Sequence, residues 1–200
     1  MEIRALLLCG GAARRFGANK LLAPIPGEEG RGPIVARAAA NLREGAGTPL
    51  ALVPIGAREL RDVLEPLGCE VVESDRTALG MGASLAAAVA ATDRAGGWIV
   101  ALGDMPLIAP ATIRAVRDAL AEGALLAAPV SASGGVRGHP VGFAAALGPE
   151  LLALDGDVGA RRVLERHRDA LRIVTTDDPG ILVDLDTPEQ LAALAARLRV

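Results

Sequence analysis

The chain has 200 residues, of which 51% are hydrophobic and 22% are charged, and its formal net charge is −3. This length suffices for one well-buried core and is short for two independent domains, so we expect a single domain over residues 1–200. The slight negative charge and the 2% aromatic content exclude a broad polyanion-binding face and a base-stacking platform, so nucleic acid is not an expected partner.

The first apolar run, ALLLC, ends at Cys9 and admits the interpretation of a lipoprotein signal. It is too short for one, and two glycines and two arginines follow it. The other cysteine, Cys69, has no CxxC or Cys/His spacing, so neither a disulfide framework nor a zinc site is indicated. This cysteine usage fits a reducing cytoplasm, where we expect the protein. No charge-free apolar run reaches the length of about 18 residues that a membrane span needs, so we expect no spanning helix and no membrane partner.

Short apolar runs alternate with segments of helical periodicity over the first two thirds of the chain. Strands are expected at residues 3–9, 50–55, 69–73, 97–102 and 125–130. Helices are expected at residues 33–44, 57–66, 83–93 and 110–121. This alternation and the continuously apolar strands predict an α/β fold of three layers, Rossmann-like, with a mostly parallel sheet and helices on both faces.

The pattern changes after about residue 130. The Gly-rich segment SASGGVRGHPVGF ends in a short β-like stretch and predicts a hairpin or flap after the fifth strand. The remaining expected elements are helices near 148–153 and 158–168, strands near 171–175 and 181–185, and a last amphipathic helix from Pro188 to Arg199.

The loop after the first strand, CGGAARRFGANK, has the composition of an anion site. Gly10 and Gly11 allow the backbone to approach a bound group, and exposed loop amides form an anion nest. Arg14, Arg15 and Lys20, the sole lysine, add positive charge. The loop matches neither GxxxxGK[ST] nor GxGxxG, and a solvated basic turn is the alternative interpretation of its arginines.

Asp104 follows the strand at 97–102, within the sequence GDMP. Ligands of open parallel sheets bind at the carboxyl ends of the strands, so this carboxylate should face the same crevice as the Gly-rich loop. Mg²⁺ prefers one or two carboxylates together with phosphate oxygens. A helix cap is the alternative role for Asp104. The pairing with the basic loop favours a Mg²⁺ site for a nucleoside triphosphate.

Six segments occur in the order of one known family. They are LCGGAARRFGANK from Leu8, GMGASLAAAV from Gly80, LGDMP from Leu102, GVRGHPVGF from Gly135, GDVGARRVL from Gly156 and LVDLDTPEQL from Leu182. The chain thus resembles, over nearly its whole length, the nucleotidyltransferases that include the molybdenum cofactor cytidylyltransferases and guanylyltransferases. The resemblance implies a nucleotidyltransferase fold with a C-terminal β flap. It also implies that residues 1–130 bind the nucleotide and residues 131–200 the acceptor.

The implied reaction moves a nucleoside monophosphate, with CMP favoured, from the triphosphate to the terminal phosphate of molybdopterin and releases pyrophosphate. The alternatives are a guanylyltransferase, another small-phosphate nucleotidyltransferase, and a nucleotide-binding assembly protein for a molybdoenzyme. The presence of Arg15, Lys20 and Asp104 favours an active enzyme. A molybdoenzyme is also the implied recipient of the product.

The resemblance also assigns roles to single residues. Arg15 and Lys20 would grip the triphosphate, and Asp104 would hold Mg²⁺. The implied nucleotide-binding residues are Leu8, Cys9, Gly10, Gly11, Gly80, Gly82 and Ser84. The candidate acceptor-binding residues are Arg137, His139 and Arg161. Each has a structural alternative: Ser84 suits a helix cap, a His before Pro can be structural, and Arg161 suits an exposed helix position.

Two points stay open in the sequence. Asp184 is the candidate second metal ligand, because Asp186, before Thr187 and Pro188, suits a helix cap. The stretch LCGG resembles the LAGG of the guanylyltransferases, and a missing methyl at Gly10 would make room for a purine. The later segments resemble the cytidylyltransferases. We therefore expect CTP, with GTP as the alternative.

Overall fold

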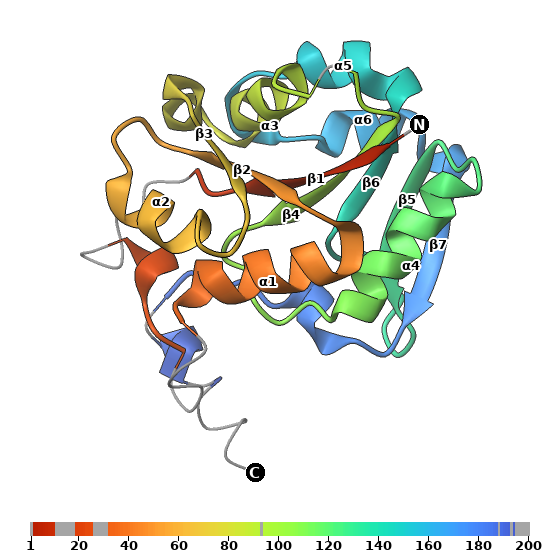
Figure 1. Ribbon diagram of the computed structural model, residues 1–200. Helices are drawn as coiled ribbons and strands as arrows, with labels where there is room; N and C mark the ends of the chain where they lie inside the picture. The colour runs from red at the N-terminus through yellow and green to blue at the C-terminus, as the bar shows by residue number, and fades with distance from the viewer. Residues whose placement is uncertain are drawn as a thin grey trace.

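The structure, a computed structural model, describes residues 2–10, 19–25, 32–92, 94–187, 189–192 and 194. Seven strands form one sheet in the order β3-β2-β1-β4-β6-β5-β7 (Figure 1). The strands are β1 (Ile3–Leu8), β2 (Pro49–Val53), β3 (Glu70–Glu73), β4 (Gly97–Leu102), β5 (Leu126–Ser131), β6 (Val141–Ala144) and β7 (Leu171–Thr176). β6 runs antiparallel to both neighbours, whereas every other pair of adjacent strands is parallel. The expected α/β fold is confirmed.

Helices cover both faces of the sheet (Figure 1). The α-helices are α1 (Ile34–Ala46), α2 (Arg58–Leu64), α3 (Met81–Ala90), α4 (Pro110–Ala121), α5 (Gly148–Leu152) and α6 (Arg161–Arg166). The 3₁₀ helices are η1 (Lys20–Leu22), η2 (Asp75–Leu79), η3 (Ala145–Leu147), η4 (Gly156–Val158), η5 (Arg168–Ala170) and η6 (Pro179–Leu182). Core residues of α1, α2 and α4 share one apolar cluster, and those of α3, α5 and α6 share the other. The three expected layers are therefore present.

The central strand β1 explains why its sequence has no polar alternation. Leu7 points into the core beneath α1, and Leu6 points into the core beneath α3; both are fully buried. Burial of a Leu side chain stabilises a fold by about 1.5–3 kcal/mol. Since both faces of β1 are covered, every position along it from Ala5 onward contributes to one core or the other, as expected for an internal parallel strand.

The segment after β5 joins the sheet instead of standing apart as a flap. Its β-like end is β6, which lies between β4 and β5. Val141 and Phe143 point into the core beneath α3, while Gly142 faces α4. A Cβ on Gly142 would lie 2.9 Å from Leu120 Cδ1, so the glycine lets α4 pack closely on this strand. The expected hairpin is therefore present, since β5 and β6 are consecutive antiparallel strands, with a further antiparallel bridge between Val130 and Arg137. Only the alternative of a separate flap is corrected, because β6 also pairs with β4 inside the sheet.

The strand expected at 181–185 is wrong. Residues 179–182 form η6, and residues 183–186 cross the carboxyl end of the sheet without joining it. Ile181 and Leu185 are buried there, and the Leu185 N–H donates to the Asp104 carbonyl at 3.0 Å. The apolar alternation that suggested a strand therefore reflects packing across the strand ends. Residues 189–192 are helical, as expected, and positions 188, 193 and 195–199 of the predicted last helix lie outside the described residues.

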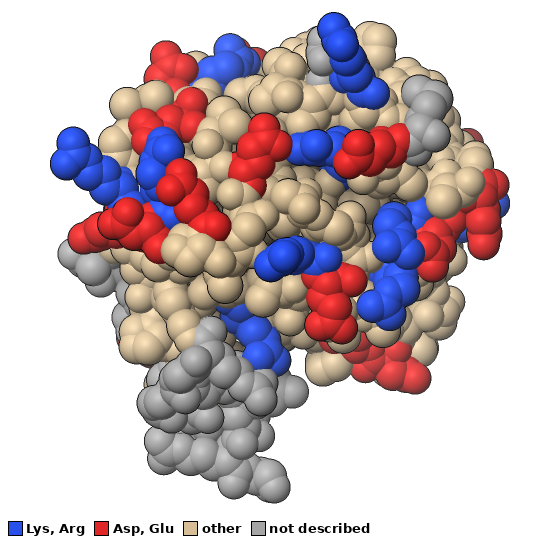
Figure 2. Space-filling model, viewed as in Figure 1, with Lys and Arg blue, Asp and Glu red and all other residues tan. Residues whose placement is uncertain are grey.

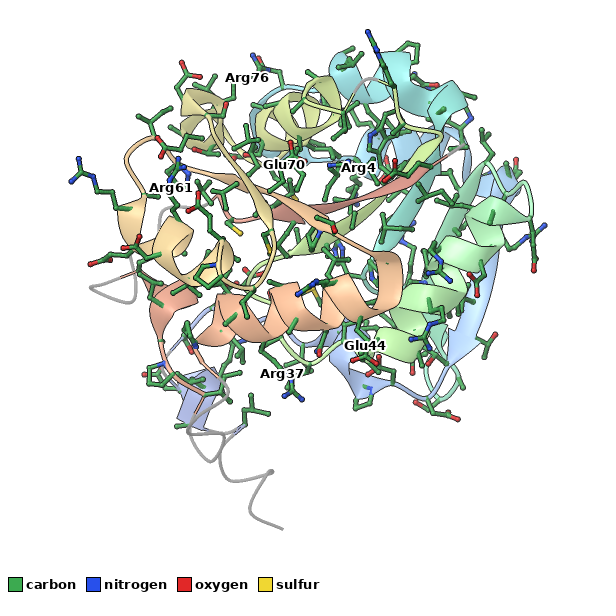
Figure 3. The ribbon with its side chains drawn as sticks, viewed as in Figure 1. Arg4, Arg37, Glu44, Arg61, Glu70 and Arg76 are labelled. Carbon is green, nitrogen blue, oxygen red and sulfur yellow. The ribbon has the colours of Figure 1, made fainter. Side chains whose placement is uncertain are left out.

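Both signs of charge are interspersed over the face shown in Figure 2. Figure 3 shows that Arg4 on β1 and Glu70 on β3 point toward one another, and their Nη2 and Oε2 atoms lie 2.6 Å apart. No helix among the described residues is both long enough and apolar enough to cross a membrane.

Candidate active site

The site forms where β1 and β4 end side by side. Leu8 pairs with Leu102 at the last positions of these strands, and the Gly103 N–H donates to the Leu8 carbonyl at 2.9 Å. Gly10 and Asp104 follow two residues later on each chain segment. A pocket of about 220 Å³ opens here, and its lining consists of Leu8, Gly10, Lys20, Leu21, Thr77, Gly80, Met81, Ser84, Leu102, Asp104 and Asp157.

Lys20 lies between two carboxylates. Its Nζ is 2.8 Å from Asp104 Oδ2, and it also donates to Asp186 Oδ1. Only 14% of the Lys20 side chain is exposed. Burial acts to lower the pKa of Lys20, but the hydrogen bonds and charges of the two carboxylates outweigh it and raise the pKa above the ordinary value. The residue therefore stays positively charged, as a phosphate-binding lysine must.

A local cap holds Lys20 at this position. Asn19 Oδ1 accepts from the Leu21 N–H at 3.2 Å, which stabilises the start of η1. The next side chain, Leu21, is buried in the core beneath α1. The backbone of Lys20 is thereby anchored, and its ammonium points to the end of the sheet.

Asp104 has one oxygen left for a cation. Its Oδ2 accepts from Lys20, whereas Oδ1 is buried and has no hydrogen-bond partner within the described part of the chain. A buried acceptor of this kind costs free energy unless a ligand satisfies it. The described residues hold no group of three or more His, Cys, Asp or Glu side chains arranged for a metal ion. Asp104 thus fits a Mg²⁺-type ion that takes its other ligands from phosphate oxygens and water.

The two candidate carboxylates near Asp104 have different surroundings. Burial, first, and then the charges of Asp186 and Asp104 raise the pKa of Asp184. Asp186 bonds Lys20, and a cap is made by Thr187: Gln190 N–H donates to Thr187 Oγ1, and Gln190 Oε1 accepts from the Thr187 N–H. Thr187 therefore contributes a capping hydrogen bond at this helix start, Asp186 contacts Lys20, and the role of Asp184 as a metal ligand stays a prediction.

Most of the predicted nucleotide-binding residues meet in this pocket. Leu8, Gly10, Gly80 and Ser84 line it together with Lys20 and Asp104. Cys9 lies beneath it, with 2% exposure, and burial raises the pKa of its thiol. Gly82 packs against the backbone of residues 155–156 instead of lining the pocket. Arg15 and Gly11 lie outside the described residues.

Gly10 does not leave open space beside the ligand. A Cβ added there would lie 3.1 Å from Ser84 Oγ and 3.2 Å from Thr77 Cβ. Both distances are closer than ordinary van der Waals contact. The volume that a methyl group would take is therefore filled by protein side chains, and the argument from the sequence that Gly10 makes room for a purine is not supported by the packing.

A second pocket of about 220 Å³ adjoins the first and shares Leu8, Met81 and Leu102 with it. All three predicted acceptor-binding residues line this second pocket: Arg137, His139 and Arg161. Its other lining residues are Leu85, Val100, Gly138, Val141, Phe143, Val158, Ala160 and Leu164. Three side chains with basic groups over a largely apolar wall suit a ligand that has an anionic group and a flat or apolar body.

The segment around η6 sets the positions of these pocket residues. The His139 N–H donates to the Ile181 carbonyl at 3.0 Å, and a Cβ on Gly138 would lie 2.2 Å from that carbonyl oxygen. His139 Nδ1 is buried and without a hydrogen-bond partner in the described part of the molecule, and burial lowers the pKa of its ring. Arg161 Nε donates to Glu165 Oε1 at 2.8 Å, so it is both an exposed helix residue and a pocket residue.

Sequence reasoning missed two polar residues of the first pocket, Thr77 and Asp157. Asp157 lies within the GDVGARRVL segment, which the sequence analysis used only for the family resemblance. Its carboxylate does not follow a predicted strand, so the rule that ligands bind at strand ends did not select it. Thr77 precedes GMGASL by three residues and occurs in η2, which has no apolar periodicity. Only the packing of η2 and η4 against α3 brings them to the site.

A mostly parallel sheet with a lysine, a metal-competent carboxylate and an adjoining basic pocket at its carboxyl edge defines a protein that handles phosphorylated nucleotides. The comparisons with known proteins are more specific. Residues 5–171 match the MobA-like NTP transferase domain, and the chain belongs to that family of nucleotidyltransferases. The recognition made from the motifs is thereby confirmed.

Three relatives span nearly the whole chain. The purine catabolism protein PucB of Bacillus subtilis is 29% identical over 92% of each chain, and the nicotine blue oxidoreductase of Paenarthrobacter nicotinovorans is 28% identical over 96% of each. The crystal structure of Rv0371c from Mycobacterium tuberculosis has 26% identity and a TM-score of 0.83 over 98% of each chain. A second structure of that protein, described as a complex with manganese, has 25% identity and a TM-score of 0.79 over 98% of this chain and 99% of that one.

Proposed function

We propose that this nucleotidyltransferase moves CMP from CTP to the terminal phosphate of a molybdopterin-type acceptor, with release of pyrophosphate, in a Mg²⁺-dependent reaction. The observation that carries the proposal is the pair of adjoining pockets. One pocket contains Lys20 and Asp104, and the other contains Arg137, His139 and Arg161. Their shared wall would bring an acceptor phosphate beside the triphosphate, which is the arrangement that phosphate-to-phosphate transfer needs.

The residues of the chain would act by position and charge. Lys20 would leave its carboxylate partners to bind the phosphates as charge builds on the departing pyrophosphate. Arg137 and Arg161 would orient the acceptor phosphate for in-line attack on the α-phosphorus. The acceptor oxygen forms the new P–O bond as the bond to the bridging oxygen breaks. Arg15 would add positive charge from the loop that precedes Lys20.

Asp104 would hold the metal, with Asp184 or Asp186 completing its carboxylate set. When bound, the ion would neutralise charge on the triphosphate oxygens and orient them. The unpartnered Oδ1 of Asp104 supports this assignment, and so does the manganese complex of the related Rv0371c. We assign Mg²⁺ as the working ion because its preference for one or two carboxylates plus phosphate fits the site.

The packing around Gly10 removes the sequence argument for GTP. Thr77 and Ser84 fill the space that a methyl at this position would take, so Gly10 is explained by the protein's own side chains. The later segments, which resemble the cytidylyltransferases, then support CTP. On the domain plan expected from the sequence, residues 1–130 would form most of the CTP site and residues 131–200 most of the acceptor site, with Asp157 of the second part also lining the first pocket.

A molybdoenzyme in the cytoplasm is the proposed recipient of the product. The alternative of a nucleotide-binding assembly protein lacking transfer activity gives a different result in a pyrophosphate-release assay, because it would bind the triphosphate without releasing pyrophosphate.

The name of one relative, an oxidoreductase, adds a further test. The purified protein should not oxidise NADH or NADPH in the presence of electron acceptors, since the sequence after β1 lacks the GxGxxG pattern.

The decisive assay measures pyrophosphate release from the purified protein with Mg²⁺, molybdopterin and each of CTP, GTP, ATP and UTP. CTP should give the highest rate. The substitution Asp104→Asn should abolish turnover, whereas Asp177→Asn, which changes an exposed carboxylate outside both pockets, should not affect it. Pyrophosphate release that is fastest with GTP would establish the guanylyltransferase alternative, and no release with any triphosphate would refute the transferase.

A further inference from the structure

The nucleotide pocket has two ends, on opposite faces of the sheet. Lys20 begins η1, whose Leu21 packs into the core beneath α1. Asp157 belongs to η4, which packs against the start of α3 on the other face. Figure 1 shows α1 and α3 on these two sides. The carboxylates that act on Lys20 are those of Asp104 and Asp186. One end of the pocket therefore has the Lys20 ammonium group beside the metal-competent carboxylate of Asp104, and the other end carries the Asp157 carboxylate with no basic group beside it among the described lining residues.

The hydroxyl groups at the Asp157 end have used their hydrogens within the protein. Ser84 Oγ donates to the Gly80 carbonyl at 2.8 Å, and Thr77 Oγ1 donates to the Ser74 carbonyl at 2.8 Å. Each hydroxyl has a single hydrogen, so these oxygens can only accept a further hydrogen bond. A carboxylate is likewise an acceptor. The side chains at this end of the pocket thus offer acceptors, and a ligand that binds here must bring donors.

Gly80 allows Asp157 to occupy its position. The φ of Gly80 is +117°, in a region that favours glycine. A Cβ there would lie 2.2 Å from Asp157 Oδ1, so any other residue would push the carboxylate away. The side chain of Asp157 is exposed at the pocket rim and has no hydrogen bond or ion pair with another described residue. It is held against the start of α3 and is available to a ligand.

We propose that Asp157 accepts a hydrogen bond from the exocyclic amino group of the nucleotide base and thereby selects cytosine over uracil. This inference rests on the proposed cytidylyl transfer. Lys20, together with a divalent cation on Asp104, would hold the triphosphate at their end of the pocket, and the base would then lie toward Asp157. Cytosine has an N4 amino donor where uracil has the O4 carbonyl, and a carboxylate attracts the first and repels the second. Ser84 and Thr77, as acceptors, add to the same preference.

The test compares CTP with UTP in the wild-type protein and in three variants. Binding of each Mg-nucleotide is measured by calorimetry, and kcat/KM is measured by pyrophosphate release with molybdopterin. In Asp157→Asn, the amide can turn its NH₂ toward O4 of uracil, so the CTP-to-UTP ratio should fall by about tenfold or more. In Asp157→Ala, affinity for CTP should fall without a matching gain for UTP. Asp155→Asn removes a neighbouring exposed carboxylate that lines neither pocket, and it should leave the ratio unchanged.

Two different failures are distinguishable. If the wild-type protein transfers CMP but Asp157→Asn keeps its CTP-to-UTP ratio, Asp157 does not read the base, while the proposed function stands. If the wild-type protein prefers GTP or UTP to CTP, or releases no pyrophosphate, the inference fails together with the cytidylyl transfer on which it rests. Circular dichroism of each variant checks the fold, which an exposed Asp→Asn change should leave intact.

Discussion

Replacing Lys20 by Met should make the protein bind Mn²⁺ more tightly when no nucleotide is present. In the wild-type protein the ammonium group occupies the carboxylates of Asp104 and Asp186, so an added cation must displace it. At an effective dielectric constant of about 20, charges at the 2.8 Å separation of Lys20 Nζ and Asp104 Oδ2 attract by about 6 kcal/mol. Desolvation and partial exposure reduce the net value to about 2–3 kcal/mol. The Lys20→Met variant should therefore bind Mn²⁺ about 30- to 150-fold more tightly.

The free Mn²⁺ concentration, measured by electron paramagnetic resonance during titration, gives this affinity without any turnover. Lys20→Arg keeps the charge and serves as the control, with an affinity near that of the wild-type protein. Because two facing carboxylates destabilise the unloaded variant, Mn²⁺ should raise the melting temperature of Lys20→Met more than that of the wild-type protein. Equal Mn²⁺ affinity in wild-type protein and Lys20→Met would refute the reasoning, since it would mean that the ammonium does not compete for the metal-binding carboxylates.

Four further predictions concern stability, thiol reactivity and pH. Gly10→Ala should lower the free energy of unfolding by about 1–3 kcal/mol, because its Cβ would press on Ser84 and Thr77, and it should not make GTP the preferred nucleotide in the pyrophosphate assay. Asp178→Ala removes the cap that accepts from the Ala109 N–H and the Thr112 hydroxyl at the start of α4, and calorimetry should show a loss of about 1–2 kcal/mol. Burial raises the pKa of Cys69 to about 11 and also raises that of Cys9. A disulfide reagent at pH 8 should therefore label both thiols only after the protein unfolds, and rapid labelling of the native protein would contradict the packing. Hydrogen bonds from His167 and then Arg166 lower the pKa of Glu150. The ionised carboxylate therefore adds to the free energy of unfolding above its ordinary pKa of 4.5, and this contribution is lost as the pH falls. In Glu150→Gln, the free energy of unfolding in urea should vary less with pH over that acid range, and an unchanged pH profile would argue against these bonds.

The sequence predicted well those strands and helices whose pattern of apolar residues follows directly from which of their faces are buried. β1 and β4 are continuously apolar because helices cover both of their faces, and the rule that ligands bind at the carboxyl ends then places Lys20 and Asp104 together. Arg137, His139 and Arg161 were chosen from motifs, and all three line one pocket. Their individual roles stay predictions.

The predictions that failed depend on contacts between distant segments. The hairpin of β5 and β6 was expected, but a separate flap was the other expectation, and only the completed sheet shows that β6 also pairs with β4. Asp157 reaches the pocket because Gly80 and Gly82 allow η4 to lie against α3, which no local pattern indicates. In the sequence Asp-Thr-Pro, Thr187 has the hydroxyl that the Gln190 N–H reaches, and Asp186 contacts the distant Lys20.

The wrongly predicted strand is the part of the chain where structural contacts with both pockets concentrate. The segment from Asp178 to Asp186 caps α4 at its start and bonds Lys20 at its end. Between these points, the Ile181 carbonyl accepts from the His139 N–H of the second pocket, and the Leu185 N–H donates to the Asp104 carbonyl of the first. A strand added to the sheet edge would make none of these contacts. The apolar side chains that gave the segment its strand-like alternation instead bury it across the strand ends, where its polar groups fix the relative position of the two pockets.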